Sequence, residues 1–104
     1  MIINTNINKI KSLINNKKSF IICTYHIDAY SKIYSARLNL LLNKDLINVY
    51  YLNIEDFMCV CNLNKRIFPI FCIFIKGELS WKKCGFIEYN ELFNEYTKKE
   101  VLFS

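Results

Sequence analysis

Apolar residues recur along this chain with two different periods, and the change from one to the other predicts the helices and strands. Over residues 5–16 they are three or four positions apart, as on one face of an α-helix, with Asn4 or Thr5 as the expected N-cap. A second stretch with this spacing runs from residue 28 to about 43, and Asp28 is well suited to cap it. The pattern therefore predicts two amphipathic helices in the first half of the chain.

A further helix is predicted near the end of the sequence, where Asn90 is the expected cap. The apolar positions of the second helix are Tyr30, Ile33, Tyr34, Leu38, Leu41 and Leu42. Those expected on the inner face of the last helix are Leu92, Phe93, Tyr96 and Val101.

Four short runs are apolar and rich in β-branched or aromatic residues, which is typical of buried strands. They lie at residues 19–25, 47–54, 70–76 and 79–87, with a turn at 76–78 and Gly85 inside the last run. Residues 55–66 are expected to form a short irregular helix. The order αβαβαββα requires one parallel βαβ unit and one hairpin, which gives an α/β fold with a four-stranded mixed sheet and helices on both faces.

The length of 104 residues fits one domain, in which a helix within residues 1–16 precedes a core at 18–102. Hydrophobic residues make up 53% of the chain, so a packed core is expected. No apolar run approaches the ~18 residues of a membrane helix, and the N-terminal residues lack the pattern of a signal peptide. We therefore expect a cytoplasmic protein without membrane contact.

The net charge of +5 raises the question of nucleic-acid binding. The basic residues are scattered as pairs, most of them Lys, without an RNA-binding aromatic motif or zinc-finger spacing. Frequent Lys, Asn and Ile with only 2 Gly point to AT-rich coding as the origin of the charge. Nucleic acid is therefore not the expected partner.

The chain has five cysteines and no secretory signal, so a disulfide framework is not expected. Cys59 and Cys61 would face the same way on a strand but about 200° apart on a helix. The sequence leaves this open, and the simpler interpretation is one buried thiol, one exposed thiol and no bond. Cys23 and His26 have the spacing of a nucleophile or metal pair, but His26 is more simply a loop residue, and no metal site is expected.

Three stretches in register carry a family resemblance. They are "DAYSK" at 28–32, "YLNIED" at 51–56 and "FPIFCIFIKGELSWKKCG" at 68–85. Together with the element order, they make residues 18–97 resemble the thioredoxin/glutaredoxin superfamily. The resemblance implies a cis peptide between Phe68 and Pro69, whose main chain faces an extended peptide or glutathione beside the turn at 28–31.

The same resemblance places the family's two active-site cysteines at Asp28 and Ser31. A carboxylate suits a helix N-terminus but cannot attack a disulfide, and a serine hydroxyl cannot resolve one. The family's buried Asp, its partner Lys and its Trp before the turn match Ile22, Tyr51 and Thr24. The resemblance therefore implies loss of the dithiol together with its proton-transfer groups.

The leading hypothesis is a redox-inactive, thioredoxin-like module that binds a protein or extended peptide without a cofactor. Its binding groove is expected to contain Asp28, Ala29, Tyr30, Ser31, Phe68, Pro69, Cys84 and Gly85. The alternative is an atypical thiol–disulfide oxidoreductase that uses Cys59 and Cys61, or a single thiol such as Cys84 with glutathione. A weaker alternative is a basic adaptor in an RNA-processing complex. Trp81 either packs on the edge strand or belongs to a docking patch.

Overall fold

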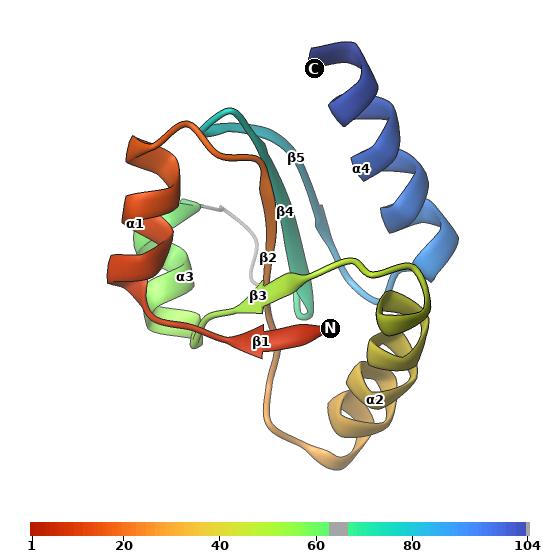
Figure 1. The fold of residues 1–104 in the computed structure, drawn as a ribbon. Helices are drawn as coiled ribbons and strands as arrows, with labels where there is room; N and C mark the ends of the chain where they lie inside the picture. The colour runs from red at the N-terminus through yellow and green to blue at the C-terminus, as the bar shows by residue number, and fades with distance from the viewer. Residues whose placement is uncertain (63–66, 104) are drawn as a thin grey trace.

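The computed structural model describes residues 1–62 and 67–103, with side chains as far as Lys99. Its sheet has five strands in the order β1-β3-β2-β4-β5 (Figure 1), which are β1 Ile2–Asn4, β2 Phe20–Thr24, β3 Val49–Tyr51, β4 Ile70–Ile75 and β5 Glu78–Cys84. The helices are α1 Ile7–Asn15, α2 Ala29–Lys44, α3 Ile54–Val60 and α4 Tyr89–Phe103. Helices α1 and α3 cover one face of the sheet, and α2 and α4 cover the other.

The α/β class and the mixed sheet agree with the prediction from sequence, but the expected four strands are corrected to five. The additional strand, β1, pairs in parallel with β3, with Ile2 opposite Val49. Further hydrogen bonds hold it, among them one from the Thr5 N–H to the Tyr51 carbonyl at 3.0 Å and one from the Ile2 N–H to Asn39 Oδ1 at 2.7 Å. A three-residue edge strand has too few positions to display a period, so only its pairing identifies it.

Two helix starts differ from the prediction. The α1 cap is Asn6, whose side chain accepts a hydrogen bond from the Lys9 N–H at 2.9 Å, instead of Asn4 or Thr5. Residues 2–4 belong to β1, which displaces the helix start toward the C-terminus. Helix α4 begins at Tyr89, so Asn90 lies in its first turn rather than at its cap. The predicted inward position of Val101 lies outside the described side chains.

The middle of the chain also corrects the prediction. Strand β3 ends at Tyr51, because the Asn53 side chain accepts a hydrogen bond from the Asp56 N–H at 2.8 Å and caps α3. The expected strand at 47–54 is therefore shorter, and its last residue is helical. Residues 63–66 of the expected irregular helix lie outside the described residues. Strand β5 ends just before Gly85, which was expected inside it.

Strands β2 and β4 are buried on both faces, and their antiparallel register pairs Ile22 with Cys72. Alternate residues therefore enter two separate cores. The core beneath α2 and α4 includes Ile21, Cys23, Leu42, Phe71, Ile73 and Leu92. The core beneath α1 and α3 includes Ile10, Phe20, Ile22, Phe57, Ile70 and Cys72.

The β4–β5 turn is fixed against the end of α1 by Gly77. This residue has φ +82°, and its N–H donates to the Lys18 carbonyl at 2.9 Å. A Cβ atom there would lie 2.5 Å from the Ile14 carbonyl oxygen. The close approach and the left-handed backbone together require glycine at this turn. Among the described residues, no helix is long and apolar enough to cross a membrane.

Two leucines in α2 provide a matched test of the packing. The Leu42 side chain is fully buried beneath the sheet, whereas Leu40 is 72% exposed. We expect Leu42→Ala to lower the free energy of unfolding by about 2–5 kcal/mol, because it leaves a cavity in the core. Leu40→Ala should change it by no more than about 0.5 kcal/mol. Urea unfolding of both variants measures the difference, and equal effects would contradict the orientation of α2.

Candidate functional site

Three loops meet at one end of the sheet. Strand β2 ends with Thr24 opposite Ile70, which begins β4, and Ile70 in turn lies opposite Cys84 at the end of β5. The Gly85 N–H also donates to the Pro69 carbonyl at 2.7 Å. The loops at 25–28, 67–69 and 85–88 are therefore neighbours, as Figure 1 also indicates. The sheet thus brings most of the sequence-predicted site residues to the same end of the molecule.

The turn before α2 is organised by Asp28. Its Oδ1 accepts a hydrogen bond from the Ser31 N–H at 2.7 Å, which makes Asp28 the N-cap, as predicted. This main-chain hydrogen bond is the largest cause that holds the pKa of the exposed Asp28 carboxyl below its usual range. The N-terminus of α2 therefore already has an anionic partner in Asp28. This is the residue at which the resemblance places one of the family's active-site cysteines.

Behind the turn, the polar side chains of Ser31 and Thr24 are buried. The Thr24 hydroxyl is the one buried side-chain polar atom without a hydrogen-bond partner among residues 1–62 and 67–99. An unsatisfied buried hydroxyl is unfavourable by about 1–3 kcal/mol. Neither side chain supplies an ionisable group near the turn. Ile22, which the resemblance matches to the family's buried Asp, is fully buried in the core beneath α1 and α3.

The Phe68–Pro69 peptide bond is cis. Pro69 is buried, whereas Phe68 is half-buried, and its ring contacts the His26 ring edge-on with centroids 4.4 Å apart. Within the residues that the structure describes, the main-chain N–H and C=O of Phe68 have no hydrogen-bond partner. These groups can therefore form hydrogen bonds with a ligand.

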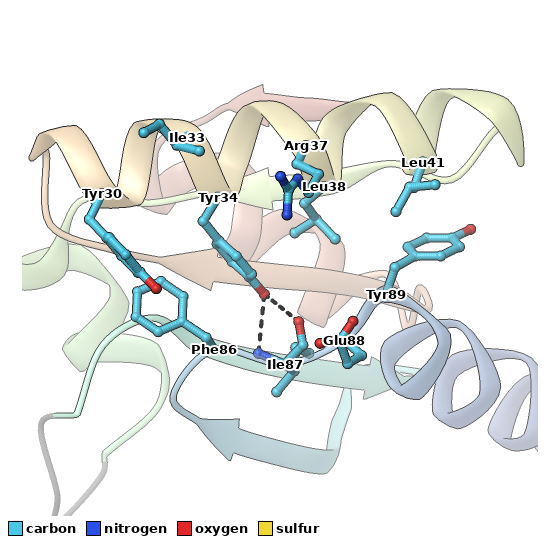
Figure 2. Close-up of a pocket in the computed structure, with 10 residues that line it drawn as sticks. All are labelled: Tyr30, Ile33, Tyr34, Arg37, Leu38, Leu41, Phe86, Ile87, Glu88 and Tyr89. Atoms are coloured by element: carbon cyan, nitrogen blue, oxygen red, sulfur yellow. Dashed lines mark hydrogen bonds between the residues drawn. The ribbon is translucent and has the colours of Figure 1, made fainter.

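Aromatic side chains connect the turn to the loop after β5. The Phe86 ring contacts Tyr30 and Tyr34 edge-on, with centroid distances of 5.0 Å and 4.9 Å. The Tyr34 hydroxyl donates to the Ile87 carbonyl at 2.9 Å and accepts from the Ile87 N–H at 3.3 Å (Figure 2). Burial raises the pKa of Tyr34 to about 12, so the hydroxyl remains protonated and keeps this link. The residue before Phe86 is Gly85, which has φ +98°, a left-handed backbone conformation that favours glycine.

Beside these rings lies an open pocket of about 430 Å³ between α2 and the segment at 86–89. Figure 2 shows its lining, which is Tyr30, Ile33, Tyr34, Arg37, Leu38, Leu41, Phe86, Ile87, Glu88 and Tyr89. Several of these side chains are mainly exposed, with Tyr30 at 70% and Ile33 at 66%. The helical stripe predicted from sequence is therefore wider than the core, and its outer part lines this pocket.

None of the five cysteines lies in the turn at 28–31, and all five are free. Cys59 is on α3 and exposed, and Cys61 follows the helix and is buried, as in the simpler interpretation from sequence. A hydrogen bond with Cys72 lowers the pKa of Cys61. The same hydrogen bond, with burial, raises the pKa of Cys72, whereas burial alone raises that of Cys23.

Other candidates occupy simpler positions. His26 is an exposed loop residue, and the described part of the chain contains no group of three or more His, Cys, Asp or Glu side chains that could hold a metal ion. Cys84 is half-buried at the end of β5. Trp81 packs against the core beneath α2 and α4, which supports its interpretation as an edge-strand packing residue.

The pocket residues on the outer side of α2 were not recognised from sequence as a site. Helical spacing assigns Ile33 and Leu41 to the same stripe as the core residues, and Arg37 within that stripe carries no signal of its own. Phe86 and Glu88 were placed within or beside the last strand. Only the exposure of these side chains in the folded chain distinguishes them from the core.

The arrangement of strands, helices and the Phe68–Pro69 bond defines the thioredoxin fold. Solved structures with this fold match almost the whole chain. Mitochondrial thioredoxin 3 from Saccharomyces cerevisiae is 17% identical with a TM-score of 0.70, covering 93% of this chain and 94% of its own. A chain from the complex of ferredoxin:thioredoxin reductase and thioredoxin f2 is 15% identical with a TM-score of 0.69, and the match covers 95% of this chain and 94% of that one.

A protein described as a putative oxidoreductase with a thioredoxin fold is 19% identical with a TM-score of 0.69, covering 89% of this chain and 91% of its own. No family model and no curated protein sequence matches the chain. At these identities the comparisons establish the fold, and the chemistry of the site has to be argued from its own residues.

The lowered pKa of Asp28 predicts a pH-dependent contribution of the cap to stability. The ionised form is favoured by folding, so the stabilisation is present above about pH 4 and is lost as the pH falls through the folded pKa. We expect Asp28→Ala to melt below the wild type at pH 7 and the gap to narrow in acid. Asp28→Asn keeps the cap without the charge, so the difference in melting temperature between Asp28→Asn and Asp28→Ala should not depend on pH. Thermal melts between pH 2 and 7 measure both, and a gap independent of pH would contradict the role of the carboxylate.

Proposed function

We propose that this protein is a thioredoxin-fold binding module without dithiol chemistry at α2, and that it binds an extended protein segment beside Phe68. The observation that carries the proposal is the Phe68 main chain, which has no partner among the described residues and offers one donor and one acceptor to a ligand. An extended segment would use both groups as an added strand does.

The side chains around Phe68 support a protein ligand. Ile27, Ile67 and Phe86 are exposed on the three loops at this end of the sheet, and Tyr30 is exposed in the first turn of α2. Exposed apolar residues that gather at one site, rather than singly, are typical of interaction surfaces. They can provide side-chain contacts, while the Phe68 main chain sets the direction of the bound segment.

The chemistry of the turn supports a role without catalysis. Asp28 and Ser31 stand at the positions where the resemblance would put thiols, and neither can form a disulfide. Asp28 is held by the helix N-terminus through the Ser31 N–H. Cys84 is half-buried nearby, but no second thiol from the turn is present to resolve a mixed disulfide at Cys84.

The first test is a thiol titration of the folded protein across glutathione buffers that span the cellular range of potentials. We expect no intramolecular disulfide, because the turn at 28–31 holds no thiol, Cys59 is exposed while Cys61 is buried, and the Cys72 thiol beside Cys61 is kept protonated. Alkylation and mass spectrometry measure the result. Closure of a pair with a defined midpoint would favour the alternative of an oxidoreductase, and Cys61→Ser or Cys59→Ser would identify the pair.

The second test uses peptides selected from a random library on the immobilised protein. We expect the bound peptide to shift the amide resonances of Phe68, Gly85 and the turn at 28–31. Methylation of the one peptide nitrogen that faces the Phe68 carbonyl should weaken binding by about tenfold or more, which is the effect of about 1.4 kcal/mol from a lost hydrogen bond.

Two exposed apolar residues, one at the proposed site and one distant from it, provide a control for this test. Phe86→Ala should weaken the selected peptide, whereas Leu79→Ala, at the opposite end of β5, should not. A resonance footprint elsewhere, or insensitivity to methylation at every peptide nitrogen, would overturn the proposed binding mode.

A further inference from the structure

The pocket along α2 differs in kind from the site beside Phe68. Its α2 wall presents Tyr30, Ile33, Arg37 and Leu41, which are separated by three or four residues and span about 16 Å of helix. The opposite wall is the segment at 86–89, with the Phe86 and Tyr89 rings at its two ends (Figure 2). The floor is formed by Tyr34 and Leu38, which are part of the packed interior.

The side of the 86–89 segment that faces α2 gives an added strand little to pair with. The Ile87 N–H and C=O, which point to α2, are both bonded to the Tyr34 hydroxyl, and beyond its first turn the α2 main chain is bonded within the helix. An extended segment would therefore leave its own main-chain groups unpaired where it is buried. A helix satisfies its main chain internally, and its apolar residues repeat at the spacing that the α2 wall presents.

Two charges determine what such a helix must carry. Arg37 is exposed in the middle of the apolar stripe, and among the described residues it has neither an ion pair nor a hydrogen bond. Glu88 lines the opposite wall and also lacks an ion pair within residues 1–62 and 67–99. By contrast, the nearby carboxylates of Asp45 and Glu91 are bonded to Tyr89 and Lys83.

Covering Arg37 with an apolar surface would bury an unpaired guanidinium, which is strongly unfavourable. A partner can cover the pocket only if it brings a carboxylate to Arg37, and a donor to Glu88 wherever that side chain is also covered. The planar guanidinium is well suited to bidentate hydrogen bonds with a carboxylate. Charge complementarity therefore specifies the partner more closely than the apolar lining does.

We propose that the pocket between α2 and residues 86–89 binds an amphipathic helix of a partner protein, with an acidic side chain of that helix paired to Arg37. This inference rests on the proposed role as a binding module but uses a separate surface. The two surfaces adjoin at Tyr30 and Phe86. One partner could thus place an extended segment beside Phe68 and a helix along α2.

The test uses three designed helical peptides of about 16 residues with the same apolar stripe, long enough to follow α2 along the pocket. They differ at the one position that faces Arg37, which is Glu, Gln or Lys. Fluorescence anisotropy at low ionic strength should give the Glu peptide an affinity about tenfold or more above that of the Lys peptide. Added salt should reduce this preference, because the pair is at the rim of the pocket.

The reciprocal change is made in the protein. Arg37→Glu should invert the order, so that the Lys peptide binds more tightly than the Glu peptide. Lys32→Glu makes the same charge change on α2 at a residue outside the pocket lining and should leave the order unchanged. Circular dichroism melts verify that both variants fold, which is expected because both side chains are exposed.

Equal affinities for the Glu and Lys peptides, or an order that Arg37→Glu does not change, would overturn the proposal. So would amide shifts that fall outside residues 30–41 and 86–89. Self-association that Arg37→Glu abolishes in sedimentation would assign the pocket to a second copy and also overturn it. The site beside Phe68 is tested with extended peptides, so each proposal can fail while the other holds.

Discussion

The antiparallel pairing of β2 with β4 is the interaction on which the rest of this structure depends. Both strands are buried on both faces, so their alternate side chains fill two cores, one beneath α2 and α4 and one beneath α1 and α3. A shift of one residue in β4 alone would exchange its Phe71 and Cys72 between these cores. The different shapes of the two cores therefore fix the register, and the register fixes where every loop at the end of the sheet begins.

The same register assembles the candidate site. It places Thr24, Ile70 and Cys84 in one row across three strands, so the loops beyond them become neighbours although they are far apart in the sequence. The resulting end of the sheet carries a helix N-terminus, which in general attracts an anion. Here the chain supplies that anion itself in the carboxylate of Asp28. The position is therefore electrostatically satisfied and chemically inert toward disulfides.

The two proposed surfaces at this end of the molecule differ in what they offer a partner. Within the described residues, the Phe68 main chain has hydrogen-bonding groups without a partner, whereas the pocket along α2 offers mainly side chains. Main-chain contacts tolerate many sequences, whereas the exposed Arg37 guanidinium would favour a particular charge. A partner that used both surfaces would gain general affinity from the first and selectivity from the second.

The sequence alone determined the fold class and most of the elements. Runs such as 19–25 and 70–76 are strongly apolar, Asp28 is a good cap, and both signals act within a few residues. It also determined that no thiol stands at the turn, because residue identity needs no folding. Strand β1 and the α1 cap at Asn6 were decided by the pairing of β1 with β3. This is a contact between distant segments, so it produces no periodic pattern in the local sequence.

The division of α2 into core and pocket was likewise decided by tertiary structure. Ile33 and Leu42 look equivalent in the pattern, but only Leu42 is buried, because only part of the apolar stripe of α2 packs against the core. The state of Cys59 and Cys61 depended on whether their segment formed a helix or a strand, which the Asn53 cap decided together with packing of Phe57. Local sequence sets what each segment can form, and burial decides which of its side chains remain available for binding.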